Sequence, residues 1–181
     1  PGRVDPLQDN IAARLPLLNA TNDVYRESGM ALMSPPGHER PANMATLKAR
    51  GAKMIVYHGV ADAIFSAEDT RQWMMRMDQA LGGQGDRFAR YFPVPGMAHC
   101  TGGPATDQFD LLGPLVKWVE QGVAPQAVTA SARGAGNAGG VNAELPADWS
   151  ANRSRPLCAY PTVAQYTGTG SVDAASSFVC R

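Results

Sequence analysis

Two side chains that could work together as an acid and a base follow two separate apolar runs of the sequence. Asp62 comes after the run Lys53–Tyr57, and His99 comes after the run Phe88–Val94. Both runs are typical of buried strands, and parallel sheets bind ligands at the carboxyl ends of their strands. A histidine that acts as a general base needs a carboxylate to fix its tautomer and to stabilise its imidazolium form. The pair therefore predicts the acid and the base of a Ser-His-Asp relay at one edge of a sheet.

The residues around this pair each have a functional and a structural interpretation. Asp62 could instead stabilise a turn, and His99 could be an exposed loop histidine. His58 could contact a substrate or be a structural histidine bonded to the backbone, and Phe65 could stack on an aromatic acyl group or simply pack. His99 and Cys100 could ligate a metal ion. Zinc needs about four ligands, however, and the other cysteines have the wrong spacing, so we expect no metal in this chain.

Two helices are expected to connect and follow the two strands. Ser66, with Asp69 three residues later, matches a capping box and predicts a helix that ends at Gly82–Gly83. The segment Asp107–Glu120 carries an apolar stripe, in which Pro114 would kink the helix or mark the start of its regular part. A strand, a crossover helix and a second strand imply parallel strands, so the expected fold class is α/β.

The remaining segments have weaker patterns. Asn10–Leu18 and Asn22–Met33 carry apolar residues at helical spacing, and a further short helix is expected at Pro41–Arg50. Residues 122–155 are rich in glycine, alanine and asparagine, so we expect an exposed loop there. Residues 156–181 contain two cysteines and scattered aromatic side chains, and they indicate an irregular C-terminal wrap.

Composition argues against several classes of protein. The chain of 181 residues has 16 Lys and Arg and 16 Asp and Glu, so its formal net charge is zero and it has no electrostatic footprint for nucleic acid or anionic membrane. No apolar run approaches the ~20 residues that a membrane-spanning helix needs. The 19 glycines and 14 prolines favour turns and ordered loops over a helical bundle. The three cysteines are an odd number, so in an exported protein one thiol stays free or pairs outside the chain.

Four motifs, in this order, carry a resemblance to a known family. They are Lys53–Asp62 (KMIVYHGVAD), Pro95–Gly103 (PGMAHCTGG), Trp118–Pro125 (WVEQGVAP) and Arg155–Pro161 (RPLCAYP). On these motifs, residues 42–181 resemble the tannase and feruloyl esterase family of α/β-hydrolases. The run Asp62–Thr70 is most similar to the bacterial branch that contains mono(2-hydroxyethyl) terephthalate hydrolase.

The resemblance implies a role for each matched position. Asp62 would be the triad acid and His99 the general base. Cys100 would form a disulfide with a cysteine outside this chain, next to the nucleophilic serine, and Cys158 would pair with Cys180. Residues 1–50 would be the end of an inserted lid with its connecting segment. Residues 51–181 would be the C-terminal part of the catalytic domain, with a disulfide-stapled tail.

The chain departs from the family because it contains neither Gly-x-Ser-x-Gly nor Cys-Ser-x-Gly-Gly. We therefore expect the serine, the oxyanion hole and most of the lid in a missing N-terminal portion or a companion chain, disulfide-linked through Cys100. No cofactor is expected in this chain, because the calcium site of the family would belong to the missing lid.

The resemblance implies a carboxylic ester hydrolase that acts on galloyl, feruloyl or terephthaloyl esters. Because disulfides imply an oxidising compartment, we expect it to be secreted or periplasmic. Two alternatives stay open: a non-catalytic α/β binding module, and another α/β-hydrolase activity such as a peptidase or a lactonase.

Overall fold

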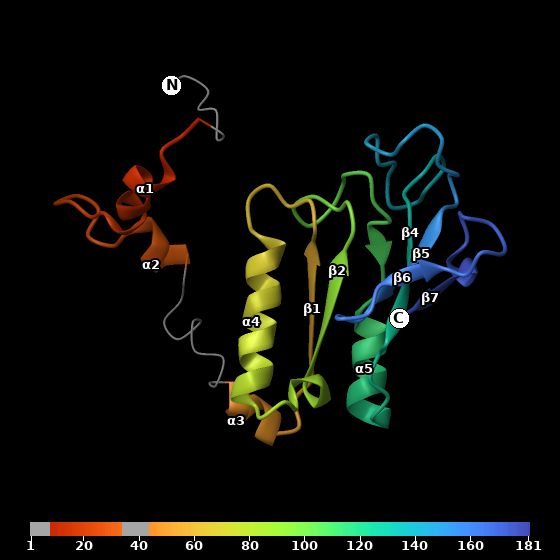
Figure 1. The fold of residues 1–181 in the computed structure, drawn as a ribbon, viewed down its shortest axis with the longest axis horizontal. Coiled ribbons are helices and arrows are strands. Elements are labelled where there is room, and N and C mark those ends of the chain that lie inside the picture. Colours follow the sequence, from red (N-terminus) through yellow and green to blue (C-terminus); the bar gives the residue numbers. More distant parts are fainter. Residues whose placement is uncertain (1–7, 34–43) are drawn as a thin grey trace. The chain divides into compact units, whose positions relative to one another are not determined.

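Figure 1 shows the computed structural model, which describes residues 8–33 and 44–181. The chain separates into two units, residues 1–40 and residues 41–181. Within the described residues, no helix is long and apolar enough to cross a membrane.

The first unit holds two short α-helices, α1 (Ile11–Arg14) and α2 (Gly29–Met33), and a 3-10 helix at Leu15–Asn19. The helical pattern expected over Asn22–Met33 is thus realised only at its end. The side chain of Asn22 accepts hydrogen bonds from two following backbone N–H groups, at 2.9 and 2.8 Å. Such a local turn competes with a helix, which explains why α2 begins seven residues later.

The second unit is built on two parallel strands and the helix that connects them. Strand β1 (Met54–Gly59) pairs in parallel with β2 (Ala89–Val94), and α4 (Ala67–Ala80) lies between them in the sequence. The side chain of Ser66 caps α4 by accepting a hydrogen bond from the backbone N–H of Asp69. The predicted strand–helix–strand unit and its parallel pairing are confirmed.

Two shorter helices flank this unit. Helix α3 (Met44–Ala49) precedes β1, and a 3-10 helix at Gly85–Arg87 leads into β2. Helix α3 covers the described part of the helix expected at Pro41–Arg50, whose first three residues lie outside the described residues. Gly51 follows α3 with a φ of 78°, a conformation that glycine adopts without strain.

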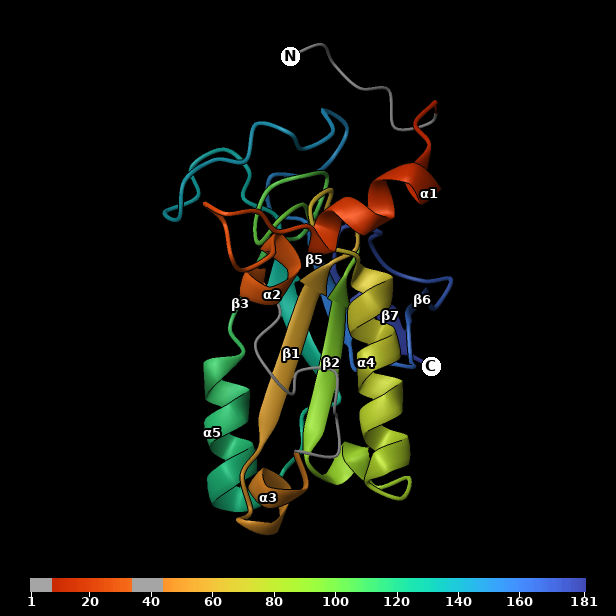
Figure 2. The same cartoon turned by 90° about the vertical axis from the view of Figure 1, so that its left-hand side faces the viewer.

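A second, antiparallel sheet has the order β3 (Gln108–Phe109), β4 (Ala127–Ser131), β5 (Ser154–Cys158). Helix α5 (Leu112–Gln121) connects β3 to β4. Figure 2 shows α4 and α5 on opposite sides of the β1–β2 pair. The second unit is therefore an α/β arrangement, as the sequence predicts.

Strand β2 buries side chains on both of its faces, because successive side chains of a strand point in opposite directions. Ala89 and Tyr91 belong to a core cluster that contains Met74 and Met77 of α4. Phe92 and Val94 belong to a second cluster, formed with residues of β4 and β5. The β2 strand thus lies between two cores, which fixes the position at which its C-terminal loop starts.

The expected helix at Asp107–Glu120 begins later than the apolar stripe suggests. Gln108 and Phe109 form β3 instead, paired with β4. The carboxylate of Asp110 accepts hydrogen bonds from the N–H groups of Leu112, at 2.8 Å, and of Gly113, at 3.1 Å, which stabilises the start of α5. Pro114 falls in the first turn of α5, where proline is tolerated because no hydrogen bond is lost.

The expectation of an exposed loop over residues 122–155 is wrong in part. This segment contains β4 and the first residues of β5, and Val128 and Ala130 of β4 are buried. The side chain of Asn142, in the glycine-rich part, is also buried and donates a hydrogen bond to a backbone carbonyl. The sequence of β4, Ala127–Ser131, alternates small residues and contains no continuous apolar run, so a search for apolar runs does not detect this strand.

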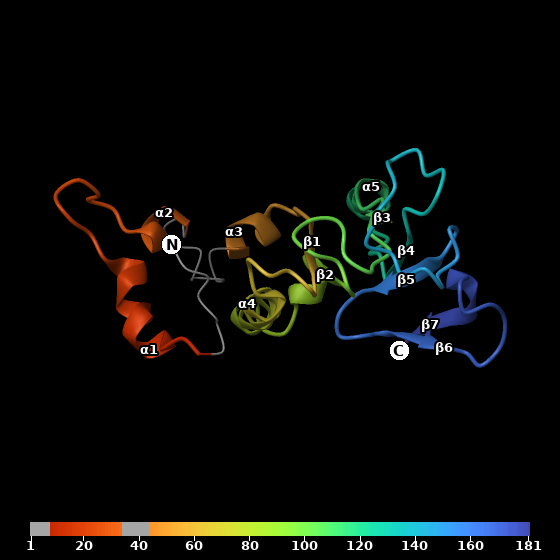
Figure 3. The ribbon, with the colours of Figure 1, turned by 90° about the horizontal axis from the view of Figure 1, so that it is seen from above.

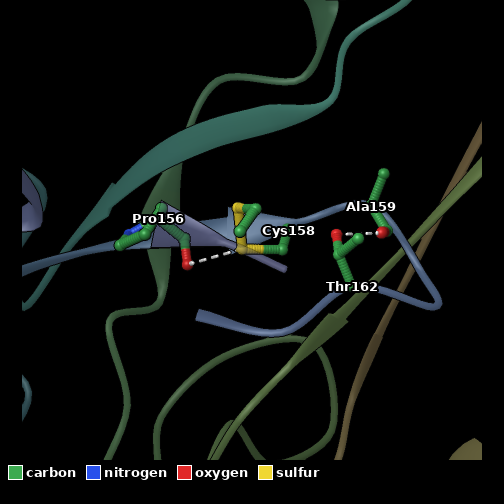
Figure 4. The surroundings of a disulfide bond; sticks show 5 residues. Pro156, Cys158, Ala159 and Thr162 are labelled. Carbon is green, nitrogen blue, oxygen red and sulfur yellow. Dashed lines mark hydrogen bonds between the residues drawn. A yellow bond between two sulfur atoms is a disulfide. The ribbon is translucent and has the colours of Figure 1, made fainter. Parts of the chain in front are cut away.

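The C-terminal segment has more regular structure than the predicted wrap. Strands β6 (Ala164–Tyr166) and β7 (Phe178–Cys180) pair in antiparallel fashion, next to β5 in the view of Figure 3. A disulfide joins Cys158 to Cys180, the expected pairing, with their Cα atoms 5.5 Å apart. Figure 4 shows this bond at the end of β5, where it ties the tail to the second sheet.

Candidate active site

The loops that follow β1 and β2 pack against each other through their backbones. The N–H of Val60 donates to the carbonyl of Val94, and the N–H of Ala61 donates to the carbonyl of Met97, both at 3.0 Å. A Cβ atom added to Gly59 would lie 2.3 Å from the carbonyl oxygen of Ala98. This close approach needs a residue without a side chain, and it brings the two loops into register.

The register places Asp62 and His99 within bonding distance. The Nδ1 atom of His99 lies 2.8 Å from Oδ2 of Asp62. Asp62 is held by its own loop as well, because Oδ1 accepts the N–H groups of Ile64, at 2.7 Å, and of Phe65, at 3.0 Å. The hydrogen bond from His99 is the largest cause that lowers the pKa of Asp62 below its ordinary value, and the two backbone hydrogen bonds add to it. Asp62 therefore stays ionised over the physiological range.

The hydrogen bond to Asp62 also assigns the tautomer of neutral His99. A carboxylate only accepts, so Nδ1 carries the proton and Nε2 has a free lone pair. In the part of the chain that the structure describes, Nε2 makes no hydrogen bond, and the His99 side chain is 43% exposed against 4% for Asp62. An oriented imidazole with an accessible, unprotonated Nε2 can take a proton from a hydroxyl.

Both ring nitrogens of His58 are used inside the protein. Nδ1 lies 2.8 Å from Oγ1 of Thr70, and Nε2 lies 3.2 Å from the carbonyl oxygen of Phe65 and 3.4 Å from Oδ2 of Asp62. Because a carbonyl only accepts, Nε2 is the donor. These contacts favour the structural interpretation, in which His58 braces the loop that carries Asp62.

Phe65 lies beside His99, with the two ring centroids 5.4 Å apart. Both line a cavity of about 470 Å³, together with Tyr57, His58 and Met97. Cavities of this size hold small ligands, and a half-exposed aromatic ring next to the base offers a flat apolar contact. The predicted residues are thus brought together around one cavity.

Cys100 lies directly after His99, and its thiol is exposed and free. Its φ of 66° lies in the left-handed region that non-glycine residues rarely adopt. Cys100 lines the same cavity as His99. Within residues 8–33 and 44–181, no cluster of three or more His, Cys, Asp or Glu side chains is arranged to hold a metal ion.

Sequence reasoning missed a group of polar residues that hold the His99 loop. They are Asp107, Arg133, Asn142 and Glu144, which contact the loop residues Thr101, Gly102 and Gly103. Arg133, Asn142 and Glu144 lie far along the sequence from the residues that they contact, so no local sequence pattern predicts these contacts. The paired glycines Gly102 and Gly103 are a local signal, because residues without side chains leave backbone groups that need partners from elsewhere.

A model of the family described as tannase and feruloyl esterase matches residues 9–181 of the chain. The chain belongs to this family. It is 46% identical over 138 residues to mono(2-hydroxyethyl) terephthalate hydrolase of Piscinibacter sakaiensis, an alignment that covers 76% of this chain and 21% of that protein. It is 30% identical over 184 aligned positions to probable feruloyl esterase B of Emericella nidulans, which covers 91% of this chain and 33% of that protein.

The fold is also similar to that of a solved family structure. The crystal structure of feruloyl esterase B from Aspergillus oryzae matches 77% of this chain with a TM-score of 0.58 and 27% identity, and the match covers 29% of that enzyme. This supports an α/β-hydrolase-like fold for the matched part of the chain. The chain spans about a fifth to a third of the length of the two family relatives.

Proposed function

We propose that this chain supplies the acid and the base of a serine-type carboxylic ester hydrolase that acts on esters of aromatic acids. The observation that carries the proposal is the 2.8 Å contact between His99 Nδ1 and Asp62 Oδ2, with Nε2 of His99 accessible at the cavity. In the proposed reaction, Nε2 removes the proton of a serine hydroxyl as the serine attacks the ester carbonyl. The same nitrogen then returns the proton to the leaving alcohol, while Asp62 stabilises the imidazolium.

The nucleophile lies outside this chain in our proposal. The sequence has no Gly-x-Ser-x-Gly or Cys-Ser-x-Gly-Gly, and the family relatives are several times longer. The exposed thiol of Cys100, one residue from the base, fits a disulfide to the polypeptide that carries the serine. Such a bond would hold the base loop and the nucleophile loop together.

The substrate class rests on the cavity and on the relatives. Phe65 presents an aromatic ring 5.4 Å from the His99 ring, and an aromatic acyl group could stack there. One relative is named for terephthalate ester hydrolysis and another for feruloyl ester hydrolysis. We therefore propose terephthaloyl, feruloyl or galloyl esters as substrates, with Phe65 as the acyl contact and His58 in a supporting position.

The organisation we propose follows from the same assignment. Residues 1–50 would be the end of a lid and its connecting segment, and residues 51–181 would be the C-terminal part of the catalytic domain. Any calcium would belong to the remainder of the lid. The disulfide between Cys158 and Cys180 favours a secreted or periplasmic location.

The test uses the full polypeptide that contains this chain, assayed on aromatic esters, on peptides and on lactones. We expect hydrolysis of the aromatic esters, and we expect His99→Ala to lower kcat by roughly 10³-fold or more, because the general base is lost. Val179→Ala, on the exposed face of β7, is the control and should keep the wild-type kcat. A His99→Ala enzyme that keeps more than a tenth of the rate would refute the assignment. Binding of aromatic esters without turnover would instead support a binding module.

A further inference from the structure

The turn that carries His99 is not held by a regular strand or helix. Cys100, Gly102 and Gly103 all have positive φ, at 66°, 76° and 73°. Two backbone hydrogen bonds lie within the turn: the N–H of Ala98 donates to the carbonyl of Gly102, at 3.3 Å, and the N–H of Ala105 donates to the carbonyl of Gly103, at 2.8 Å. Glycine adopts a positive φ without strain, but a residue with a side chain, such as Cys100, keeps one only where surrounding contacts determine it.

Asp107 supplies the first of these contacts. Its side chain is 0% exposed, and Oδ2 accepts the N–H of Gly102 at 2.8 Å and the hydroxyl of Thr101 at 3.0 Å. Burial by itself would raise the pKa of this carboxyl. The hydrogen bonds from Arg133, Gly102 and Thr101 outweigh burial, so the pKa of Asp107 is lowered and the side chain is an anion in the folded protein.

Arg133 supplies the matching cation from the segment after β4. Its guanidinium donates to both carboxylate oxygens of Asp107, at 3.0 Å from Nε to Oδ1 and 2.6 Å from Nη2 to Oδ2. The Nη2 atom also donates to the hydroxyl of Thr101, at 2.9 Å. A planar fork of this kind fixes orientation as well as charge, which an ammonium group cannot do.

Two further side chains hold the next residue of the turn. Glu144 accepts the N–H of Gly103 at 2.7 Å, and Asn142 donates to the carbonyl of Gly103 at 2.8 Å. The N–H of Asn142 in turn donates to the carbonyl of Arg133, at 2.8 Å. The segment 133–144 and the His99 turn therefore form one connected network.

We propose that Arg133 and Asp107 are positioning residues for His99, because they hold the base of its turn so that the imidazole stays in register with Asp62. The inference rests on the proposed role of His99 as general base. Neither residue lines the cavity. Their effect on the reaction would pass only through the geometry of the His99–Asp62 pair.

Arg133→Met in the full polypeptide tests this proposal by steady-state kinetics on an aromatic ester. A misplacement of about 1 Å can cost about 100-fold, so we expect kcat to fall by about 10- to 100-fold with little change in KM. Arg133→Lys, which keeps the charge and loses the fork, should recover only part of the loss. The matched control is Arg153→Met. The Arg153 side chain is equally exposed, at 18%, and it pairs at 2.7 Å with Asp173, a residue between β6 and β7. Arg153→Met should lower the melting temperature and leave kcat unchanged.

A second readout does not depend on esterase activity. Diethyl pyrocarbonate modifies unprotonated imidazole nitrogens, and trypsin releases His99 in the peptide Tyr91–Lys117 and His58 in the peptide Met54–Arg71. In Arg133→Met, the modification rate of His99 should shift from the wild-type rate toward the rate in Asp62→Asn, because His99 loses its hydrogen bond to the Asp62 carboxylate in both. The rate at His58 should stay at its wild-type value.

The two hypotheses fail in different ways. If the polypeptide hydrolyses no aromatic ester, the proposed function fails, and the labelling of His99 still decides the positioning role. If the ester is hydrolysed and Arg133→Met leaves both kcat and His99 labelling unchanged, the positioning role is overturned. An equal loss of kcat in Arg153→Met would overturn it too, because the effect would then be one of general stability.

Discussion

Substitution of Gly59 by alanine tests the geometry of the site more directly than removal of a catalytic side chain. The new Cβ would lie 2.3 Å from the carbonyl oxygen of Ala98 and 2.4 Å from that of Met97, whereas ordinary contacts begin at 3.4 Å. The two loops must therefore move apart by about 1 Å. The same movement would stretch the 2.8 Å contact between His99 and Asp62 beyond hydrogen-bond range.

We expect this displacement to lower kcat on aromatic esters by about 100-fold in the full polypeptide. Gly59 lines the cavity itself, but the substitution adds only one methyl group there, so KM should change much less than kcat. Circular dichroism and the melting temperature, measured on the same preparation, separate misplacement from unfolding. The matched control is Gly29→Ala in α2, where, apart from its chain neighbours and its own helix backbone, no atom of the described residues lies within 4 Å of the added Cβ. A folded Gly59→Ala enzyme with kcat within about threefold of wild type would show that the loop contact does not set the position of the base.

Two further predictions concern stability. The Cys158–Cys180 disulfide closes a loop of 22 residues, which stabilises the folded state by about 3 kcal/mol in the chain-entropy model. Replacing both cysteines by alanine should therefore lower the melting temperature by about 6–12 °C. An unchanged melting temperature would contradict this prediction. Asp107 has a lowered pKa in the folded state, so its contribution is complete above its ordinary pKa of about 3.9 and declines as the pH falls below that value. The difference in unfolding free energy between wild type and Asp107→Asn, measured with urea, should be smaller at pH 3 than at pH 7, and a constant difference would be inconsistent with the ion pair.

The strand–helix–strand unit could be predicted because its signals are local. The apolar run before Asp62, the cap at Ser66 and the glycines after α4 each act within a few residues. The placement of Asp62 and His99 at one edge then follows from parallel pairing, since both loops leave the same ends of β1 and β2.

The other elements were harder to predict because their causes are not local. Strand β3 forms because Phe109 pairs with Ala130, 21 residues later, although its sequence fits the apolar stripe of a helix. Strand β4 has alternating small residues, so its burial depends on the sheet it joins. The residues that hold the His99 turn, Arg133 above all, gain their partners only when the glycine-rich segment folds back over that turn.

The one-sided pairing of β1 affects how this polypeptide behaves when it is prepared by itself. In the described part of the chain, β1 is hydrogen-bonded to β2 alone, and Tyr57 on it is 46% exposed. A bare strand edge is a template for further strands, and sheets of two strands have little stability of their own. When this chain is produced without a polypeptide that covers the free edge of β1, it should therefore self-associate through that edge. A lysine substituted on β1 should increase its solubility.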